Sequence, residues 1–168
     1  MAAPKTKNTW LFLHRWFGIV TAAFLAIAAV TGCLLTMRDS LDRSVNADLF
    51  TYSGSASDRL ETIDAVSQFE LIHPDIQVTG FPLQTAPDEN IPVLLSAKPG
   101  MDSLEQNQVF LNPATAEIVG RRSTEPGWSG RQIVPLLAEL HFNLLAGDAG
   151  RIFMGFIALG WMVSSIIG

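Results

Sequence analysis

Two long runs without a charged side chain constrain this chain more than any other feature. Between Arg15 and Arg38 lie 22 uncharged residues, and the stretch from Ile152 to Gly168 adds 17 more. At about 1.5 Å of rise per residue, the first run gives a helix of about 33 Å, enough to cross a hydrocarbon core of about 30 Å. The second run is marginal in length, and we expect the chain to be a truncated part of a longer multi-span protein.

Charge is distributed unevenly around the first run. Lys5, Lys7 and Arg15 precede it without any acid, whereas all 16 carboxylates fall between Asp39 and Asp148, giving a net charge of −5. Basic residues are enriched on the cytoplasmic side of membrane spans. The pattern therefore predicts a cytoplasmic N-terminus and an acidic segment outside, and that acidity argues against a nucleic-acid partner.

The first run also resembles a secretory signal, since Val30-Thr31-Gly32-Cys33 is similar to a lipoprotein processing box. In that reading Cys33 would become a lipidated N-terminus. The run is longer than a signal core and continues past Cys33 to Met37, which favours an uncleaved helix. We then expect Cys33 to be a small buried residue, and the lipoprotein stays an alternative that an intact mass would test.

The middle of the chain has the pattern of a small α+β unit. Apolar residues recur at helical spacing up to His73-Pro74, alternate in the strand segments, and flank an Asn-Pro turn. The expected elements are a helix over Thr62–Ile72, strands over Ile76–Phe81 and Ile91–Ala97, and a hairpin of Val109–Leu111 and Ala116–Val119 around Asn112–Thr115. A unit of about 65 residues can bury only a small hydrophobic core, so we expect its stability to depend on contacts with the membrane region or a partner.

A second apolar helical pattern runs from Gly130 to Leu145. It is too apolar for an exposed helix and too short to cross a bilayer, so it predicts an interfacial or re-entrant helix. Gly147-Asp148-Ala149-Gly150 is expected to break this helix before the second span begins at Arg151.

The histidines are the main candidates for chemistry. His73 is expected to be an ordinary surface residue, whereas His14 and His141 each lie at a membrane boundary in an apolar helix, where an ionisable residue suggests function. The alternative is a histidine resting in the headgroup zone. The spans would place His14 and His141 on opposite sides, too far apart to share one metal ion.

Two further features have a functional and a structural reading. Gly18 and Thr21 leave room near His14 for a flat macrocycle or another helix. Gly18 also belongs to a series of small residues that suits helix packing, with Ala22, Ala26, Ala28 and Gly32. Four acids near the outer boundary could bind a cation, although solvated charges are the favoured reading: Asp39, Asp42, Glu139 and Asp148.

Three blocks of sequence are similar to a known family. These blocks are Leu13-His14-Arg15-Trp16-Phe17-Gly18 with Thr31-Gly32 and Arg38-Asp39, then Phe110-Leu111-Asn112-Pro113-Ala114-Thr115, then Leu140 to Gly147 with Gly150-Arg151. Together they resemble PepSY-associated transmembrane proteins of the ferric-siderophore reductase, iron-uptake type.

The resemblance implies a helical membrane fold with an inserted small α+β PepSY-like periplasmic domain in the bacterial inner membrane. The expected parts are a cytoplasmic N-terminus at 1–16, a first transmembrane helix at 17–37, the PepSY-like domain at 38–128, an interfacial helix at 129–147 and an incomplete second transmembrane helix at 150–168. Residues 38–150 would then be periplasmic.

The resemblance also implies a function. His14 and His141 match axial ligands of two b-type haems, one near each membrane face, in an electron-transfer oxidoreductase that reduces ferric siderophores. The expected partners are the lipid bilayer, a ferric siderophore or other iron chelate, and an envelope protein or a second copy of the chain. The alternative is a non-enzymatic, membrane-anchored PepSY module that binds or regulates another protein.

Overall fold

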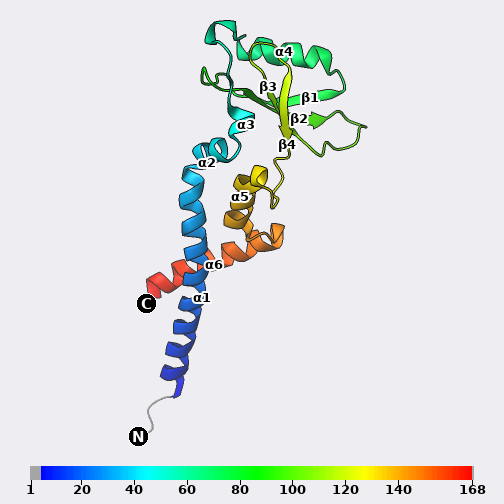
Figure 1. The fold of residues 1–168 in the computed structure, drawn as a ribbon. Coiled ribbons are helices and arrows are strands. Elements are labelled where there is room, and N and C mark those ends of the chain that lie inside the picture. Colours follow the sequence, from blue (N-terminus) through cyan, green and yellow to red (C-terminus); the bar gives the residue numbers. More distant parts are fainter. Residues whose placement is uncertain (1–4, 168) are drawn as a thin grey trace. The chain divides into compact units, whose positions relative to one another are not determined.

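A computed structural model describes residues 5–167, which form two compact units. One unit combines the N-terminal residues up to Arg38 with the segment from Leu136 onward, and the other is the intervening segment Asp39–Pro135. Figure 1 follows the chain through both units. We call them the membrane unit and the soluble unit.

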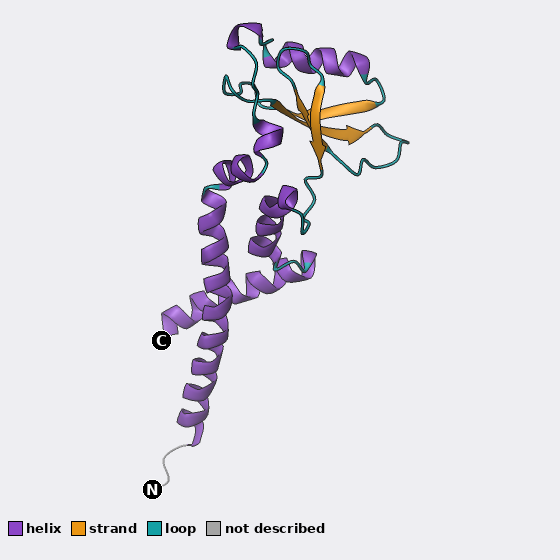
Figure 2. Ribbon diagram, in the orientation of Figure 1, coloured by secondary structure: helices purple, strands orange, loops and turns teal. Residues whose placement is uncertain are grey.

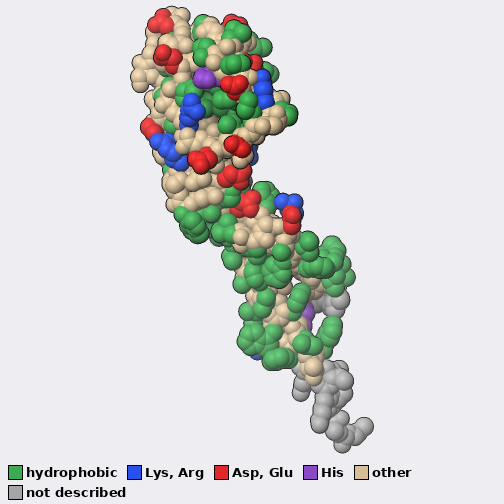
Figure 3. All heavy atoms as spheres, turned by 90° about the vertical axis from the view of Figure 1, so that its right-hand side faces the viewer, with side chains coloured by type: hydrophobic (Ala, Val, Ile, Leu, Met, Phe, Trp, Pro, Cys, Tyr) green, Lys and Arg blue, Asp and Glu red, His purple; other side chains and the backbone are tan. Residues whose placement is uncertain are grey.

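The membrane unit is built from helices. They are α1 (Lys5–Thr36), α5 (Ile133–Asn143, after a 3-10 turn at Gly130–Gln132) and α6 (Gly147–Ile167). Two of them are long and apolar enough to cross a membrane, over Thr9–Thr36 and Gly147–Ile166. Few of their side chains are buried within the protein, and Figure 3 shows hydrophobic side chains over these helices and acidic and basic ones over the soluble unit. A surface of this kind is stable against lipid but not against water.

Aromatic side chains hold α1 against α6. Phe24 and Phe153 meet edge to face with their ring centroids 5.0 Å apart, a favourable arrangement for two aromatic rings. Phe17 fills the space left by the missing side chain of Gly160, where a Cβ atom would lie 2.4 Å from the ring. Ile157, between these two contacts in sequence, is 7% exposed. The two helices therefore pack through aromatic rings, one pair against each other and one ring against a glycine.

The connection from α5 to α6 differs from the expected one. The helix ends at Asn143, whose side-chain oxygen accepts a hydrogen bond from the Leu145 amide, and both Leu144 and Leu145 have positive φ angles. The segment Gly147–Gly150, expected as the break, instead forms the first turn of α6. Gly150 is required there because a Cβ atom would lie 1.7 Å from the Asn143 carbonyl oxygen.

The soluble unit contains one antiparallel sheet with a helix on one face, which confirms the expected α+β unit. The helix is α4 (Thr62–Ile72), and the strands are β1 (Ile76–Gly80), β2 (Ile91–Ala97), β3 (Gln108–Leu111) and β4 (Ile118–Arg122). The strands pair in the order β1-β2-β3-β4, and Figure 2 shows α4 lying along the sheet. Because side chains alternate along a strand, Ile91, Val93 and Leu95 of β2 all lie on the α4 face.

The core of the soluble unit lies between α4 and the sheet. It consists of α4 side chains one turn apart, alternate strand residues and one turn residue: Ala65, Val66, Phe69, Ile91, Val93, Leu95, Val109, Leu111 and Ala116. Ala116 was expected within the second strand of the hairpin. Its φ of 57° instead places it in the turn, where Asn112 accepts a hydrogen bond from the Ala114 amide, and β4 begins two residues later.

The opposite face of the sheet is covered by two short helices that the sequence did not predict. They are α2 (Arg38–Val45) and α3 (Ala47–Phe50), which follow α1 directly. Phe50 packs edge to face on Phe110 of β3 at 4.9 Å. Arg122 of β4 makes two 2.6 Å hydrogen bonds to the Asp42 carboxylate, and a third to Gln108 at 2.7 Å. A buried, bidentate ion pair therefore joins α2 to the sheet.

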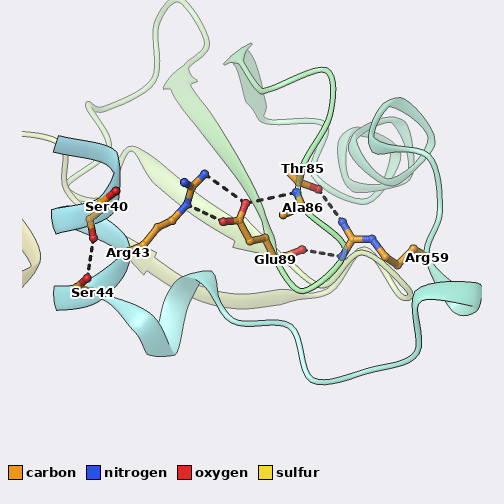
Figure 4. Close-up of polar contacts among 7 residues, drawn as sticks. All are labelled: Ser40, Arg43, Ser44, Arg59, Thr85, Ala86 and Glu89. Carbon is orange, nitrogen blue, oxygen red and sulfur yellow. Dashed lines mark hydrogen bonds and ion pairs between the residues drawn. The ribbon is translucent and has the colours of Figure 1, made fainter. Parts of the chain in front are cut away.

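A second set of polar contacts holds the segment before β2 (Figure 4). The Glu89 carboxylate forms an ion pair with Arg43 of α2, whose Nε atom lies 2.6 Å from Oε1. On the other side, the Arg59 guanidinium donates to the Glu89 carbonyl at 2.7 Å and to the Thr85 hydroxyl at 2.6 Å. Arg59 follows a 3-10 turn at Ala56–Asp58. These bonds fix the long loops at this end of the sheet.

Candidate functional site

His141 lies in α5 and its imidazole packs on α1 within the membrane unit. Its Nδ1 atom is 3.0 Å from the Ala28 carbonyl oxygen and 3.0 Å from the Thr31 hydroxyl oxygen. The ring also covers Gly32, where a Cβ atom would lie 3.0 Å from the ring carbon Cε1. The small pair Ala28 and Gly32, which the sequence marked for close packing, thus receives a histidine ring.

These contacts favour the tautomer of His141 that carries its proton on Nδ1. A carbonyl oxygen only accepts hydrogen bonds, so the Ala28 contact is a hydrogen bond when Nδ1 carries the hydrogen. The Thr31 hydroxyl donates to the Ile27 carbonyl at 2.7 Å, which leaves its oxygen to accept from Nδ1 as well. In the neutral ring, Nε2 therefore holds the lone pair. A metal-bound histidine usually shows this pattern, one nitrogen donating to a carbonyl and the other coordinating.

His14 lines an apolar groove between α1 and α6. The groove has a volume of about 540 Å³, within the range of small-molecule sites. Its other lining residues are aromatic or aliphatic, apart from Gly160 and Ser164: Trp10, Leu13, Phe17, Phe156, Leu159 and Val163. Gly18, one turn after His14, has open space where a side chain would be, whereas Thr21 is 2% exposed and is taken up by packing.

The two histidines occupy separate levels of the membrane unit. His141 contacts α1 between Ala28 and Gly32, which lie 14 to 18 residues after His14. At about 1.5 Å of rise per residue, that spacing is about 21–27 Å along the helix. The two imidazoles therefore cannot bind one ion together, and each would serve its own ligand.

The expected haem would need an imidazole at each level, and each level has one. Neutral imidazole is a common ligand of haem iron, and the Ala28 contact favours the His141 tautomer with its lone pair on Nε2. His14 faces a mostly apolar groove, which suits the flat, apolar face of a macrocycle. Among residues 5–167 each level offers one imidazole, and no group of three histidine, cysteine or acidic side chains could hold a metal ion.

Three of the acids that the sequence offered as ligands for a cation contact other side chains instead. Asp42 is not a solvated charge, because it pairs with Arg122 and its side chain is only 15% exposed. Glu139 accepts a hydrogen bond from the Asn143 side chain, at the end of α5. Asp148 is exposed and lies 3.6 Å from Arg151, one turn further along α6. These contacts give no reason to place a cation there.

Two other sequence candidates can be placed. His73 caps the end of α4, with its ring 4.6 Å from that of Phe69 in the soluble unit. Cys33, expected to be buried, is exposed, because it lies on the opposite side of α1 from the buried Thr31. Sequence reasoning missed two residues that matter: Thr31, which positions His141, and Arg122, which joins α2 to the sheet. Thr31 could have been suspected as a hydroxyl one residue from the Gly32 packing position.

The sequence was compared with known proteins. The model of the PepSY-associated TM region family matches residues 11–168, which includes both histidines and the whole soluble unit. No curated protein matches the chain. Together with its two apolar helices, the match makes this a membrane protein with a small α+β domain. The chain belongs to the PepSY-associated TM region family.

Proposed function

We propose that the chain is a haem-binding electron-transfer protein of the bacterial inner membrane that reduces ferric siderophores in iron uptake. The observation that carries the proposal is the hydrogen bond from His141 Nδ1 to the Ala28 carbonyl, which leaves Nε2 as a ligand. A histidine serving only as a polar side chain at a membrane surface has no need of a buried backbone acceptor on a neighbouring helix. His14, in its apolar groove, is the second proposed ligand.

Each residue has a defined part in this proposal. Thr31 and Ala28 orient the His141 ring and keep its proton on Nδ1. The groove residues around His14 offer an apolar surface. A bound haem b would supply one-electron exchange. His14 and His141 would each hold one haem through Nε2, and a second copy of the chain could supply a further ligand at each level.

The charge pattern supports an orientation for the proposal. Lys5, Lys7 and Arg15 lie before or within the first turns of α1, where no acid occurs, which favours a cytoplasmic N-terminus. The soluble unit, Asp39–Pro135, would then be periplasmic, where a ferric siderophore arrives.

Absorption spectroscopy of the purified chain tests the proposal. We expect a Soret band after expression with an adequate haem supply, reduced in both His14→Ala and His141→Ala. The matched control is His73→Ala, the one other histidine, which should leave the band unchanged because it lies in the soluble unit. Absence of the band in the wild-type protein would contradict the proposal and favour the alternative, a membrane-anchored PepSY module that binds or regulates another protein.

A further inference from the structure

The soluble unit contains a polar cavity beside the loop that leads to α5. Its volume is about 310 Å³, and its lining side chains are all polar. Three arginines face it, with two serines and one acid: Arg121, Arg122, Arg131, Ser123, Ser129 and Glu105. We propose that this cavity binds the phosphate of an anionic phospholipid headgroup, with the exposed Trp128 inserted beside it into the bilayer interface.

The arginines differ in how much of their charge is already neutralised. Arg122 is 8% exposed and gives both terminal nitrogens to Asp42, so it forms a fixed wall. Arg131 pairs with Asp48, but that pair is exposed. The Arg121 side chain has no hydrogen-bond or ion-pair partner within the described part of the chain. Its guanidinium is therefore available for an anion, and the planar fork of arginine matches the oxygens of a phosphate group.

The loop carrying Trp128 is held rigid. At its start, Asn107 exchanges two hydrogen bonds with Thr124, at 2.7 and 2.8 Å. At its end, Gln132 donates to the Glu125 carbonyl at 3.0 Å and accepts from the Ser129 hydroxyl at 2.8 Å. The Trp128 side chain nevertheless remains 87% exposed. A large ring held out in this way is unfavourable in water, and tryptophan is enriched at membrane interfaces.

The cavity lies only a few residues along the chain from the membrane unit. Arg131 lies five residues before Leu136, where the membrane unit resumes, which is a reach of at most about 18 Å. The same loop borders the helices that follow α1: Gly130 approaches Val45 of α2, and Arg131 pairs with Asp48 of α3 at 2.6 Å. Both segments that join the soluble unit to the membrane unit therefore lie near residues of this loop in the sequence or contact them.

Fluorescence quenching by brominated lipid tests the proposal in vesicles that contain the full chain. A variant with Trp10, Trp16 and Trp161 changed to Phe leaves Trp128 as the one tryptophan. Vesicles contain phosphatidylglycerol and phosphatidylcholine in fixed ratio, with bromine on the upper acyl chain of one or the other. We expect phosphatidylglycerol to be enriched roughly fivefold around Trp128, the preference of one basic side chain near an anionic surface.

Substitutions and a competing anion complete the test. Arg121→Gln should abolish the preference, whereas Lys98→Gln, at the opposite edge of the sheet beside β1, should preserve it. Equal quenching by the two lipids, or no quenching, would overturn the proposal. Loss of the preference when inorganic phosphate replaces chloride at equal ionic strength would also overturn it, because the cavity would then take free phosphate.

Discussion

Replacing Arg122 with glutamine removes the central contact between α2 and the sheet. The guanidinium is 8% exposed, makes two 2.6 Å bonds to Asp42 and one to Gln108, and lies over the rings of Phe50 and Phe110 at 5.6 and 5.4 Å. Without it, the largely buried Asp42 carboxylate has no positive partner and keeps only the hydrogen bond from the Asn46 side chain. Loss of one member of a buried ion pair costs about 3–5 kcal/mol.

Hydrogen exchange of the full chain in detergent measures this cost. At about 1.4 kcal/mol per factor of ten, the loss should speed exchange of the protected β2 and β3 amides by about 140- to 3,700-fold. Arg122→Lys keeps the charge but loses the bidentate geometry, so it should raise the exchange rate less than Arg122→Gln does. It provides the measurement if the glutamine variant does not fold.

Arg131→Gln is the matched control for this prediction. Its pair with Asp48 has the same 2.6 Å distance, but the two side chains are 44% and 63% exposed. Exposed pairs contribute about 0–1 kcal/mol, so exchange should rise by less than about fivefold. If Arg122→Gln raised exchange by less than tenfold, or no more than Arg131→Gln, the assignment of this ion pair as the main link would be refuted.

Two further predictions concern other contacts. Gly160→Leu should destabilise the α1–α6 packing by about 1–3 kcal/mol, because its Cβ would lie 2.4 Å from the Phe17 ring. Gly155→Leu is the control, because a Cβ atom there would have no atom within 4 Å. Thermal unfolding in detergent compares the two variants, and equal destabilisation would refute the packing. The hydrogen bond from Arg131 lowers the pKa of Asp48, so the pair contributes above the ordinary carboxyl range near about 4 and is lost as pH falls through the lowered pKa. A carbon-13 titration should place the Asp48 midpoint higher in Arg131→Gln, and an unchanged midpoint would contradict this.

Local patterns in the sequence were sufficient for the elements of the soluble unit. The helix Thr62–Ile72 and the strand Ile91–Ala97 were predicted with the bounds that the structure has, because apolar spacing and the His73-Pro74 stop are local signals. Both apolar spans were recognised for the same reason, since length and lack of charge suffice. Ala116 was misplaced because a left-handed alanine in a turn has no sequence signature.

Contacts between distant segments could not be read from one sequence. The start of α6 was missed because its position depends on Leu144 and Leu145 adopting positive φ, supported by the Asn143 cap, rather than on the glycines that follow. The Asp42–Arg122 pair joins residues 80 apart in the sequence. Similarly, the small residues Ala28 and Gly32 indicated close packing, but nothing in the sequence specified a histidine ring as the partner.

The proposed function depends on His141 presenting Nε2 because its Nδ1 proton is given to the Ala28 carbonyl. Nitrogen-15 spectra of histidine-labelled full chain, taken without added haem at alkaline pH, report the tautomer directly, and His14→Ala and His73→Ala assign the three rings. We expect a protonated Nδ1 and an unprotonated Nε2 for His141. A neutral ring protonated at Nε2, or an equal mixture of the two tautomers as in free imidazole, would contradict it.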